Sequence, residues 1–314
     1  MPHVVRWVLG AALMGALWGC GAADHAGPSA GGSTFSGSFP IKIACTTGMV
    51  ADVVREVGGD HVEVEQLMGE GVDPHLYKTS PGDIRKLSAA DMIFYSGLHL
   101  EGKMADVFVQ MARRKPTYAV SEEIPHETIL ETEEESFDPH IWFDVELWSK
   151  TAGVVAKALS DFDPSHAEDY AVNAKRYEEQ LAQLHTDVKS LLESVPESQR
   201  YLVTAHDAFA YFGRAYDINV MAIQGISTES EAGVKRINEL VDFLTKNKIK
   251  AVFIESSVSD RNIQALIEGC KARGHDVVIG GELFSDAMGT PGTPEGTYEG
   301  MVRHNANTIA KALK

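Results

Sequence analysis

One long run of apolar side chains at helical spacing constrains what this chain can fold into. Seven side chains follow one another at alternating steps of four and three residues: Tyr170, Ala174, Tyr177, Leu181, Leu184, Val188 and Leu191. The spacing marks one face of a continuous helix over about residues 164–193, with a proline near its start, where proline is tolerated. Thirty residues at 1.5 Å each would extend over about 45 Å. We therefore predict a rigid connector over residues 161–195, which should keep the motion of the parts it joins small.

A coiled-coil dimer is the competing structure for such a stripe. Only three heptads are present, and alanine and tyrosine occupy several of the core positions. These residues make a poor zipper, so we expect the stripe to pack within its own chain and the protein to be a monomer.

Short apolar runs alternate with helical stretches on both sides of this helix. The strands expected before it are residues 41–45, 62–68, 92–95 and 117–120, and those expected after it are 201–205, 219–223, 250–255 and 276–279. Alternation of strand and helix is typical of parallel sheets with helices on both faces. The predicted fold class is α/β, with an N-terminal lobe over 41–160 and a C-terminal lobe over 196–314. Each lobe is a parallel sheet flanked by helices, and the long helix joins the two.

The first forty residues carry export features and little that could be buried. A short basic start precedes twelve apolar residues at 7–18, too few to cross a bilayer, which takes about 20. Residues 1–19 are therefore predicted to be a signal peptide. Leu17-Trp18-Gly19-Cys20 is similar to a lipobox, in which Cys20 would be lipidated, although Trp18 stands where a small residue is usual; a plain cleaved signal peptide is the alternative. Residues 20–40, rich in Gly, Ser and Ala, are predicted to be a flexible tether.

The charge balance excludes some partners. Residues 20–314 carry 27 basic and 45 acidic side chains, a net charge of −18, because Arg6 is the only charged residue before Cys20. This charge argues against nucleic acid or anionic lipid as a partner and is compatible with a cationic ligand. Cys45 and Cys270 are the only other cysteines, so a disulfide framework is not expected.

Two copies of the tripeptide Asp-Pro-His present histidines from stiff loops. They place His75 and His140 65 residues apart, and His206 follows 66 residues later at an expected strand end. Proline restricts its own φ and makes the preceding residue extended, which suits a metal ligand held in place before the ion arrives. Asp286 follows the last expected strand. Ligands of open parallel sheets bind beyond the carboxyl ends of the strands, so we predict that the four side chains, two from each lobe, meet between the lobes.

Three imidazoles and one carboxylate suit a borderline divalent cation. Zn²⁺ is one candidate, and Mn²⁺ is the other if the aspartate binds through both oxygens. Asp73 and Asp138 stand beside their histidines and could orient the imidazoles, although solvated turn carboxylates are the alternative. Glu255, at the end of an expected strand, could line the site or bond to nearby backbone.

The motifs together resemble the TroA-like family of metal-binding lipoproteins that feed ABC transporters. The resemblance covers essentially the whole mature chain, and its carriers are residues 69–77, 137–144, 204–209, 253–257 and 280–286. It implies two α/β lobes joined by one long helix, and a metal bound by His75, His140, His206 and Asp286. A histidine at the place of His206 is the type associated with zinc or with both zinc and manganese. The chain lacks the His-rich loop of dedicated zinc-uptake members, which argues against a zinc-only role.

The predicted function is capture of Zn²⁺ or Mn²⁺, one ion per chain, and its delivery to an ABC permease and its ATPase. The protein would work in the periplasm or on the outer face of the cytoplasmic membrane, held there by the lipid at Cys20. It would not be an enzyme, because a four-ligand cage leaves little room for a substrate. One alternative is an exported metallohydrolase, which would need an open coordination position and a general base. The other is a surface adhesin of the cell-adhesion type.

Overall fold

The long helix is the element along which the rest of the fold is arranged. In the computed structural model, which describes residues 35, 37–132, 137–229 and 233–314, it is α6, Ala167–Glu193. A 3₁₀ turn, Pro164–His166, precedes it. The predicted stripe is buried except at its end, where Leu192 lies in the core and Leu191 is only half-buried. A helix turns every 3.6 residues rather than 3.5, so six turns from Tyr170 span about 21.6 residues and favour position 192.

The N-terminal lobe contains one parallel sheet of four strands. The strands are β1 (Ile41–Cys45), β2 (Val62–Gln66), β3 (Met92–Tyr95) and β4 (Thr117–Ala119), in the order β2-β1-β3-β4. Ile41 is paired with Val62, and Ile43 with Met92. Each strand lies where the sequence predicted it, within two residues at either end.

The C-terminal lobe contains two pairs of parallel strands. These are β5 (Tyr201–Thr204) with β6 (Asn219–Ala222) and β7 (Ala251–Glu255) with β8 (Val278–Leu283), and β5 lies beside β7. The prediction for the last strand was wrong, because β8 begins two residues later and extends four residues further. Gly280 and Gly281 lie at its centre, and because glycine has a low strand propensity, the sequence did not indicate that the strand continues through them.

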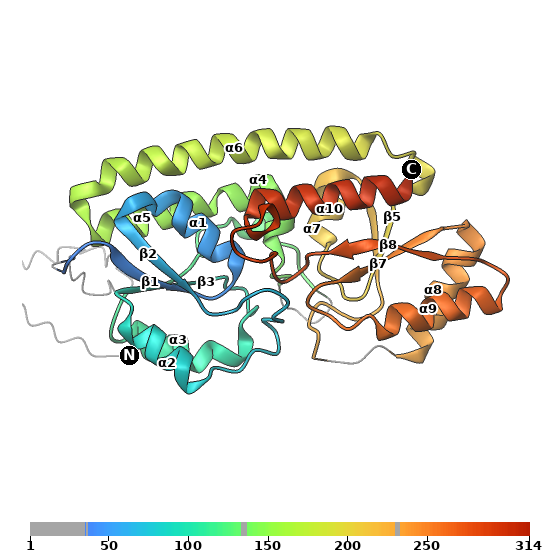
Figure 1. Ribbon diagram of the computed structural model, residues 1–314, viewed down its shortest axis with the longest axis horizontal. Coiled ribbons are helices and arrows are strands. Elements are labelled where there is room, and N and C mark those ends of the chain that lie inside the picture. The colour runs from blue at the N-terminus through green and yellow to red at the C-terminus, as the bar shows by residue number, and fades with distance from the viewer. Residues whose placement is uncertain (1–34, 36, 133–136, 230–232) are drawn as a thin grey trace, which may run out of the picture. The chain divides into compact units, whose positions relative to one another are not determined.

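Helices cover both faces of these sheets (Figure 1). They are α1 (Gly48–Gly58), α2 (Pro81–Ala89), α3 (Ala105–Ala112), α4 (Val145–Ser149), α5 (Thr151–Phe162), α7 (Ala210–Tyr216), α8 (Val234–Asn247), α9 (Arg261–Ala272) and α10 (Tyr298–Leu313). The sequence analysis assigned no helix to α4 or α5. The start of α2 shows how local sequence sets an element: Ser80 and Asp83 form a capping box, and Pro81 occupies the first turn, where its missing N–H costs nothing.

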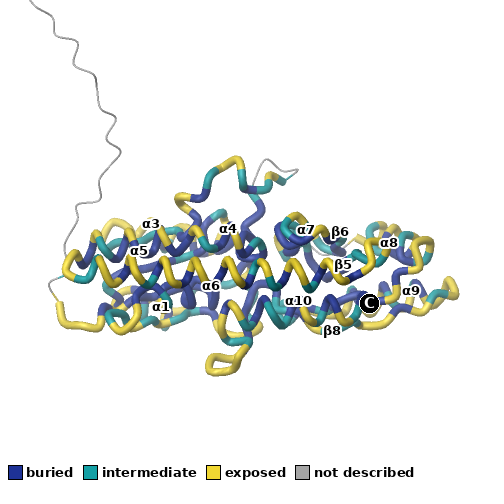
Figure 2. The backbone as a smooth tube through the Cα atoms, turned by 90° about the horizontal axis from the view of Figure 1, so that it is seen from above, coloured by how far each residue is buried: buried dark blue, intermediate teal, exposed yellow. Residues whose placement is uncertain are grey.

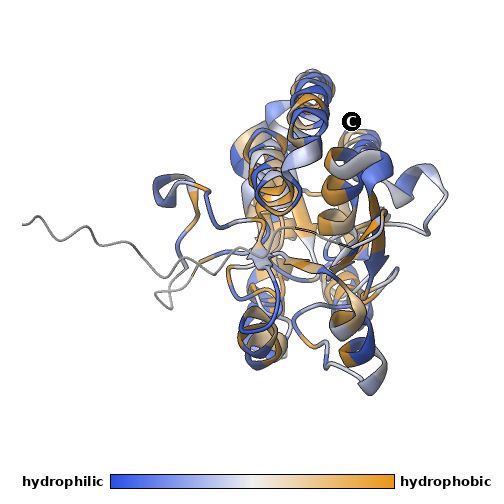
Figure 3. Cartoon of the chain, turned by 90° about the vertical axis from the view of Figure 1, so that its left-hand side faces the viewer, coloured by the Kyte–Doolittle hydropathy of each residue, from blue (hydrophilic) through white to orange (hydrophobic). Residues whose placement is uncertain are grey.

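One hydrophobic core is shared by both lobes and the long helix. It joins α1 and α5 of the N-terminal lobe to α7 and α10 through the buried face of α6. Two smaller clusters lie on the other faces of the sheets, one beneath α2 and α3 and one against α8 and α9. Figure 2 shows the alternation of buried and exposed residues along α6, and Figure 3 shows apolar residues on the strands and on the helix faces toward them. The shared core explains why the described residues form one compact unit.

The predicted signal peptide, Cys20 and most of the predicted tether lie outside the described residues. The end of the tether segment contacts the N-terminal lobe, where the Phe35 N–H donates to the Phe162 carbonyl at 2.7 Å and the two rings are in contact. Cys45 and Cys270 are buried free thiols. Within the described ranges, every helix is either too short or too polar to span a bilayer.

Candidate metal centre

Loops at the carboxyl ends of the strands carry the four residues singled out in the sequence. His75 lies in the loop between β2 and α2, and His140 immediately precedes the 3₁₀ turn Ile141–Phe143. His206 comes two residues after the end of β5, and Asp286 three residues after the end of β8. Two of the residues therefore come from each lobe.

The structure brings these four side chains together. One potential ligand atom from each of His75, His140, His206 and Asp286 lies within 4.8 Å of the others. The Nε2 atoms of His75 and His140 are 3.3 Å apart. Asp286 places Oδ1 3.3 Å from Nε2 of His140 and Oδ2 3.3 Å from Nε2 of His206. His75 is 6% exposed and the other three at most 1%, so the cluster is withdrawn from solvent.

The carboxylate of Asp286 is buried without its usual partners. Neither of its oxygens makes a hydrogen bond with any described residue, and the same holds for Nε2 of His206. Burial raises the pKa of Asp286, but the charges of His206 and His140 outweigh this effect and hold the pKa well below its usual range. Buried polar atoms in proteins normally have hydrogen-bond partners. Orphaned atoms that point at a common centre fit a site for a cation.

Two of the three imidazoles are held by a carboxylate on their far side. Nδ1 of His140 lies 2.7 Å from Oδ1 of Asp138, and Nδ1 of His206 contacts Oε2 of Glu255. The same carboxylates accept the backbone N–H groups of their histidines, each at 2.9 Å. This arrangement fixes the ring, turns Nε2 toward the centre and makes it more basic. Both carboxylates are buried, so neither is a solvated turn residue.

The same carboxylates set the protonation of the rings in the absence of a cation. Burial lowers the pKa of His140, but Asp138 and Asp286 outweigh burial and raise it to about 9. The pKa of His206 is likewise raised by Glu255 and Asp286 against the effect of burial. Burial lowers the pKa of His75 to about 4. A cation that binds at Nε2 of His140 and His206 must therefore displace protons.

Asp73 acts on its histidine differently. Its Oδ1 accepts the backbone N–H groups of His75 at 2.9 Å and Leu76 at 3.4 Å, and no carboxylate among the described residues hydrogen-bonds to the His75 ring. Asp73 therefore holds the turn that presents His75 but does not contact its imidazole, whose Nε2 lies 3.3 Å from Nε2 of His140.

Several residues around the cluster carry no signal that the sequence analysis used. The indole N–H of Trp142 donates to the Ser285 carbonyl at 3.0 Å, one residue before Asp286. The Tyr298 hydroxyl donates to the Trp142 carbonyl at 2.6 Å, and the Tyr211 hydroxyl to the Asp138 carbonyl at 2.9 Å. Each joins the two lobes over at least 73 residues of sequence. Trp142 stands two residues after His140, and this spacing is a local sequence signal that could have indicated its place beside the cluster.

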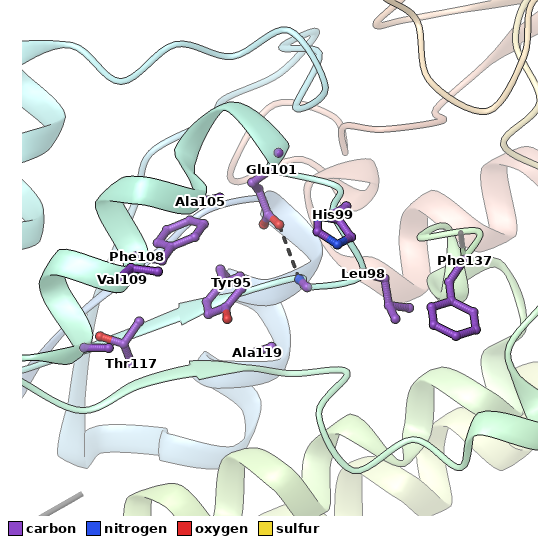
Figure 4. Close-up of a pocket in the computed structure, with 13 residues that line it drawn as sticks. Tyr95, Leu98, His99, Glu101, Ala105, Phe108, Val109, Thr117, Ala119 and Phe137 are labelled. Carbon is purple, nitrogen blue, oxygen red and sulfur yellow. Dashed lines mark hydrogen bonds between the residues drawn. The ribbon is translucent and has the colours of Figure 1, made fainter. Parts of the chain in front are cut away.

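A separate cavity of about 440 Å³ lies beside β3, β4 and α3 (Figure 4). Leu98 and His99 line it with φ angles of 52° and 64°, a region that such residues rarely adopt. Buried Glu101 stabilises this turn, because it accepts the N–H groups of Ser96 at 2.8 Å and Gly97 at 3.3 Å. It also accepts the Thr46 hydroxyl at 2.6 Å, so its hydrogen bonds hold the turn against the end of β1. None of the four clustered residues lines this cavity.

The arrangement of the cluster can hold one divalent cation. Three imidazole nitrogens and a carboxylate satisfy a tetrahedral Zn²⁺ ion, and binding by both oxygens of Asp286 would raise the coordination number to suit Mn²⁺. Two α/β lobes on a long helix, with buried cation donors from both lobes, define the class as a two-lobed receptor for a small charged solute.

Comparison with known proteins identifies the family. Residues 43–312 match the family described as "Zinc-uptake complex component A periplasmic". The chain is 50% identical over 300 residues to manganese-binding lipoprotein MntA of Bacillus subtilis, and this match covers 95% of each of the two chains. It is 48% identical over 271 residues to zinc-binding protein TroA of Treponema pallidum, which covers 86% of this chain and 88% of that protein.

A solved structure of periplasmic zinc-binding protein TroA from Treponema pallidum matches with a TM-score of 0.85 and 47% identity. The match covers 88% of this chain and 99% of the TroA chain. The chain belongs to the zinc-uptake component A family, and its α/β fold with a long linking helix is the one that the sequence predicted.

Proposed function

We propose that this protein is the solute-binding component of an ABC transporter, which captures Zn²⁺ or Mn²⁺ between its lobes and delivers the ion to a permease. The observation that carries the proposal is the convergence of four buried donors, three of whose atoms have no hydrogen-bond partner among the described residues. Membership of the family supports it, as do the names of the two similar proteins, one called manganese-binding and the other zinc-binding.

The donors of the proposed site have distinct roles. His75, His140, His206 and Asp286 bind the ion. Asp138 and Glu255 hold two imidazoles by the opposite nitrogen, which raises their basicity toward the metal. Asp73 holds the turn of His75 by its backbone. Because imidazole donors and an aspartate that can bind through one or two oxygens suit either ion, we propose both Zn²⁺ and Mn²⁺ as cargo.

The same geometry favours a carrier over the two alternatives. A metallohydrolase needs a free coordination position for water and a base beside it, whereas this cluster offers four donors. Glu255, the candidate base, has both of its oxygens on His206. Nothing in the comparisons favours a hydrolase, and the family and the named relatives support uptake rather than adhesion.

We further propose that the protein is exported and anchored by a lipid at Cys20, which follows the signal peptide 1–19. In this arrangement residues 20–40 are the tether, and the lobes 41–160 and 196–314 with the connector 161–195 form a monomer that docks on the permease and its ATPase. The word lipoprotein in the name of MntA supports the anchor. Mass spectrometry of membrane-extracted protein tests it, because Cys20→Ser should abolish the lipid-dependent gain in mass.

The function is tested by metal titration of chelator-stripped protein. We expect one Zn²⁺ per chain, competition by Mn²⁺ at the same site, and a rise in melting temperature. An ion at 1,000 times its dissociation constant should add about 4 kcal/mol to the free energy of unfolding. His140→Ala should remove most of this gain, whereas His126→Ala, at an exposed position, should retain it.

A stripped protein that binds neither ion, or an equal loss in both variants, would overturn the proposal. Hydrolysis of generic ester or phosphate substrates that depends on the bound metal would favour the enzyme instead.

A further inference from the structure

A hydroxyl group in the C-terminal lobe reaches the carboxylate that holds the His75 turn. Thr228 lies in the loop between β6 and α8, and its hydroxyl donates to Oδ2 of Asp73 at 2.5 Å. The two residues are 155 positions apart, and the contact is partly buried. Asp73 thus uses one oxygen for the backbone of His75 and the other for the opposite lobe.

His75 depends on this contact in a way that the other two histidines do not. His140 and His206 are each anchored through ring and backbone by a buried carboxylate of their own lobe. No carboxylate among the described residues contacts the His75 ring from behind, and Asp73, which is itself half-buried, holds His75 through its backbone N–H. Its loop has no regular secondary structure between Leu67 and Ser80, so the orientation of the Asp73 carboxylate determines where the imidazole lies.

We propose that Thr228 is a positioning residue for the metal ligand His75, and that it acts from the opposite lobe through Asp73. This inference rests on the proposed function. When the lobes are in contact, the Thr228 hydroxyl fixes the Asp73 carboxylate, the carboxylate fixes the turn, and the turn holds the imidazole at the centre. When the contact breaks, His75 is the donor that loses its support, and the ion is left with the three donors whose positions do not depend on it.

Two other contacts between the lobes provide controls. The Thr290 hydroxyl donates to Glu70, and Lys103 Nζ lies 2.8 Å from Oε1 of Glu229. Neither acceptor hydrogen-bonds to the backbone of a metal donor. If any contact between the lobes retained the ion, loss of the Thr290 bond would matter as much as loss of the Thr228 bond.

The test measures how fast the protein releases Zn²⁺ after mixing with excess chelator. Thr228→Val keeps the shape and removes the hydroxyl, and we expect it to speed dissociation about tenfold, the size typical of a lost support behind a metal ligand. Thr228→Ser keeps the hydroxyl and should restore slow release. Thr290→Val should release the ion at the wild-type rate. Melting of the metal-free variants reports any general loss of stability.

A double-mutant cycle shows whether the effect passes through His75. In a His75→Ala background, Thr228→Val should no longer change the affinity for Zn²⁺, because the residue it positions is gone. Equal rates for wild type and Thr228→Val would overturn the inference, and so would equal acceleration by Thr290→Val or an undiminished effect in the His75→Ala background. A wild-type protein that binds no Zn²⁺ would instead overturn the proposed function, so the two failures are distinguishable.

Discussion

The two lobes meet through two sets of contacts, one fully buried and the other partly or largely exposed. The buried set, here called the inner contacts, consists of three hydrogen bonds: Trp142 to the Ser285 carbonyl, Tyr298 to the Trp142 carbonyl and Tyr211 to the Asp138 carbonyl. All five residues are at most 1% exposed. Asp138 and Trp142 stand within two residues of His140 in the sequence, and Ser285 directly precedes Asp286.

The less buried set, here called the outer contacts, consists of the partly buried pair Thr228–Asp73 and the exposed pairs Thr290–Glu70 and Lys103–Glu229. The side chains of Lys103 and Glu229 are 31% and 54% exposed. Gly71 of the same loop, with φ of 68°, lies where a Cβ would be 3.3 Å from the Ser256 carbonyl of the other lobe. The lobes therefore approach closely here as well, but these contacts are less buried than the inner ones, so water can more easily replace them.

The difference in burial gives the two sets of contacts different effects on the stability of the protein and on release of the ion. A buried donor or acceptor that loses its partner costs about 1–3 kcal/mol, because water cannot replace the bond, whereas an exposed ion pair is worth at most about 1 kcal/mol. We infer that the inner contacts hold the lobes together, and that the outer contacts can open at little cost. His75, whose support comes from an outer contact, is then the donor that yields first.

The largest expected effect comes from Trp142→Phe. It should lower the free energy of unfolding by about 3 kcal/mol, through lost ring volume and an unpaired Ser285 carbonyl. Trp148→Phe is the matched control, since Trp148 is equally buried but its indole nitrogen has no partner among the described residues. In urea unfolding, Trp142→Phe should lose about 1–2 kcal/mol more unfolding free energy than Trp148→Phe. Equal losses would mean that the inner hydrogen bond contributes nothing beyond packing.

The second prediction concerns the pH dependence of stability at Asp52, a buried carboxylate that contacts Tyr298, one of the residues of the inner contacts. Asp52 of α1 accepts the Tyr177 hydroxyl of α6 at 3.0 Å and the backbone N–H of Tyr298 at the start of α10. Burial raises its pKa from 3.8 to about 6, which the Tyr177 hydrogen bond only partly offsets; Glu56 adds to the rise and Arg55 opposes it. Because the unfolded chain loses this proton first, the carboxyl group lowers stability as the pH rises from about 4 to 6, and the loss persists above 6.

Asp52→Asn should therefore stabilise the protein by about 2–3 kcal/mol at pH 7 and leave it unchanged near pH 4, as measured by urea unfolding across this range. Asp187→Asn, at a partly exposed carboxylate of α6, is a control that should not reproduce the gain at pH 7. A variant that is less stable than wild type at pH 7 would show that the charged carboxylate is needed at this junction.

The smallest effect is expected on the outer side. Lys103→Met removes the ion pair with Glu229 and should cost less than about 1 kcal/mol of unfolding free energy. Salt should remove most of this difference, because it screens exposed charges. Thermal melts in low and high salt check both points, with Lys103→Arg as the charge-preserving control. A loss that is large and independent of salt would erase the distinction between inner and outer contacts.

Local rules in the sequence were sufficient for most of the elements, though not for α4 and α5, and for the identity of the clustered residues. The period of α6 and the alternation of strands depend on neighbours a few residues apart, and Asp-Pro-His loops are stiff because proline restricts its own φ and the residue before it. The limits appear where non-local packing competes with local preference. The final strand continues through Gly280 and Gly281 because β7 pairs with it, despite their low strand propensity. At the end of α6, the drift of a 3.6-residue period selects Leu192 over Leu191.

By itself, the sequence determined that stiff loops at strand ends present three histidines and an aspartate, because backbone restriction and helix or strand period are local properties. Only the tertiary structure decided which groups support each of them. Asp138 and Glu255 contact imidazole rings, whereas Asp73 contacts a backbone and a threonine 155 residues away. Such pairings depend on how two lobes pack through a shared core, and that packing sums many weak contacts that no local pattern records.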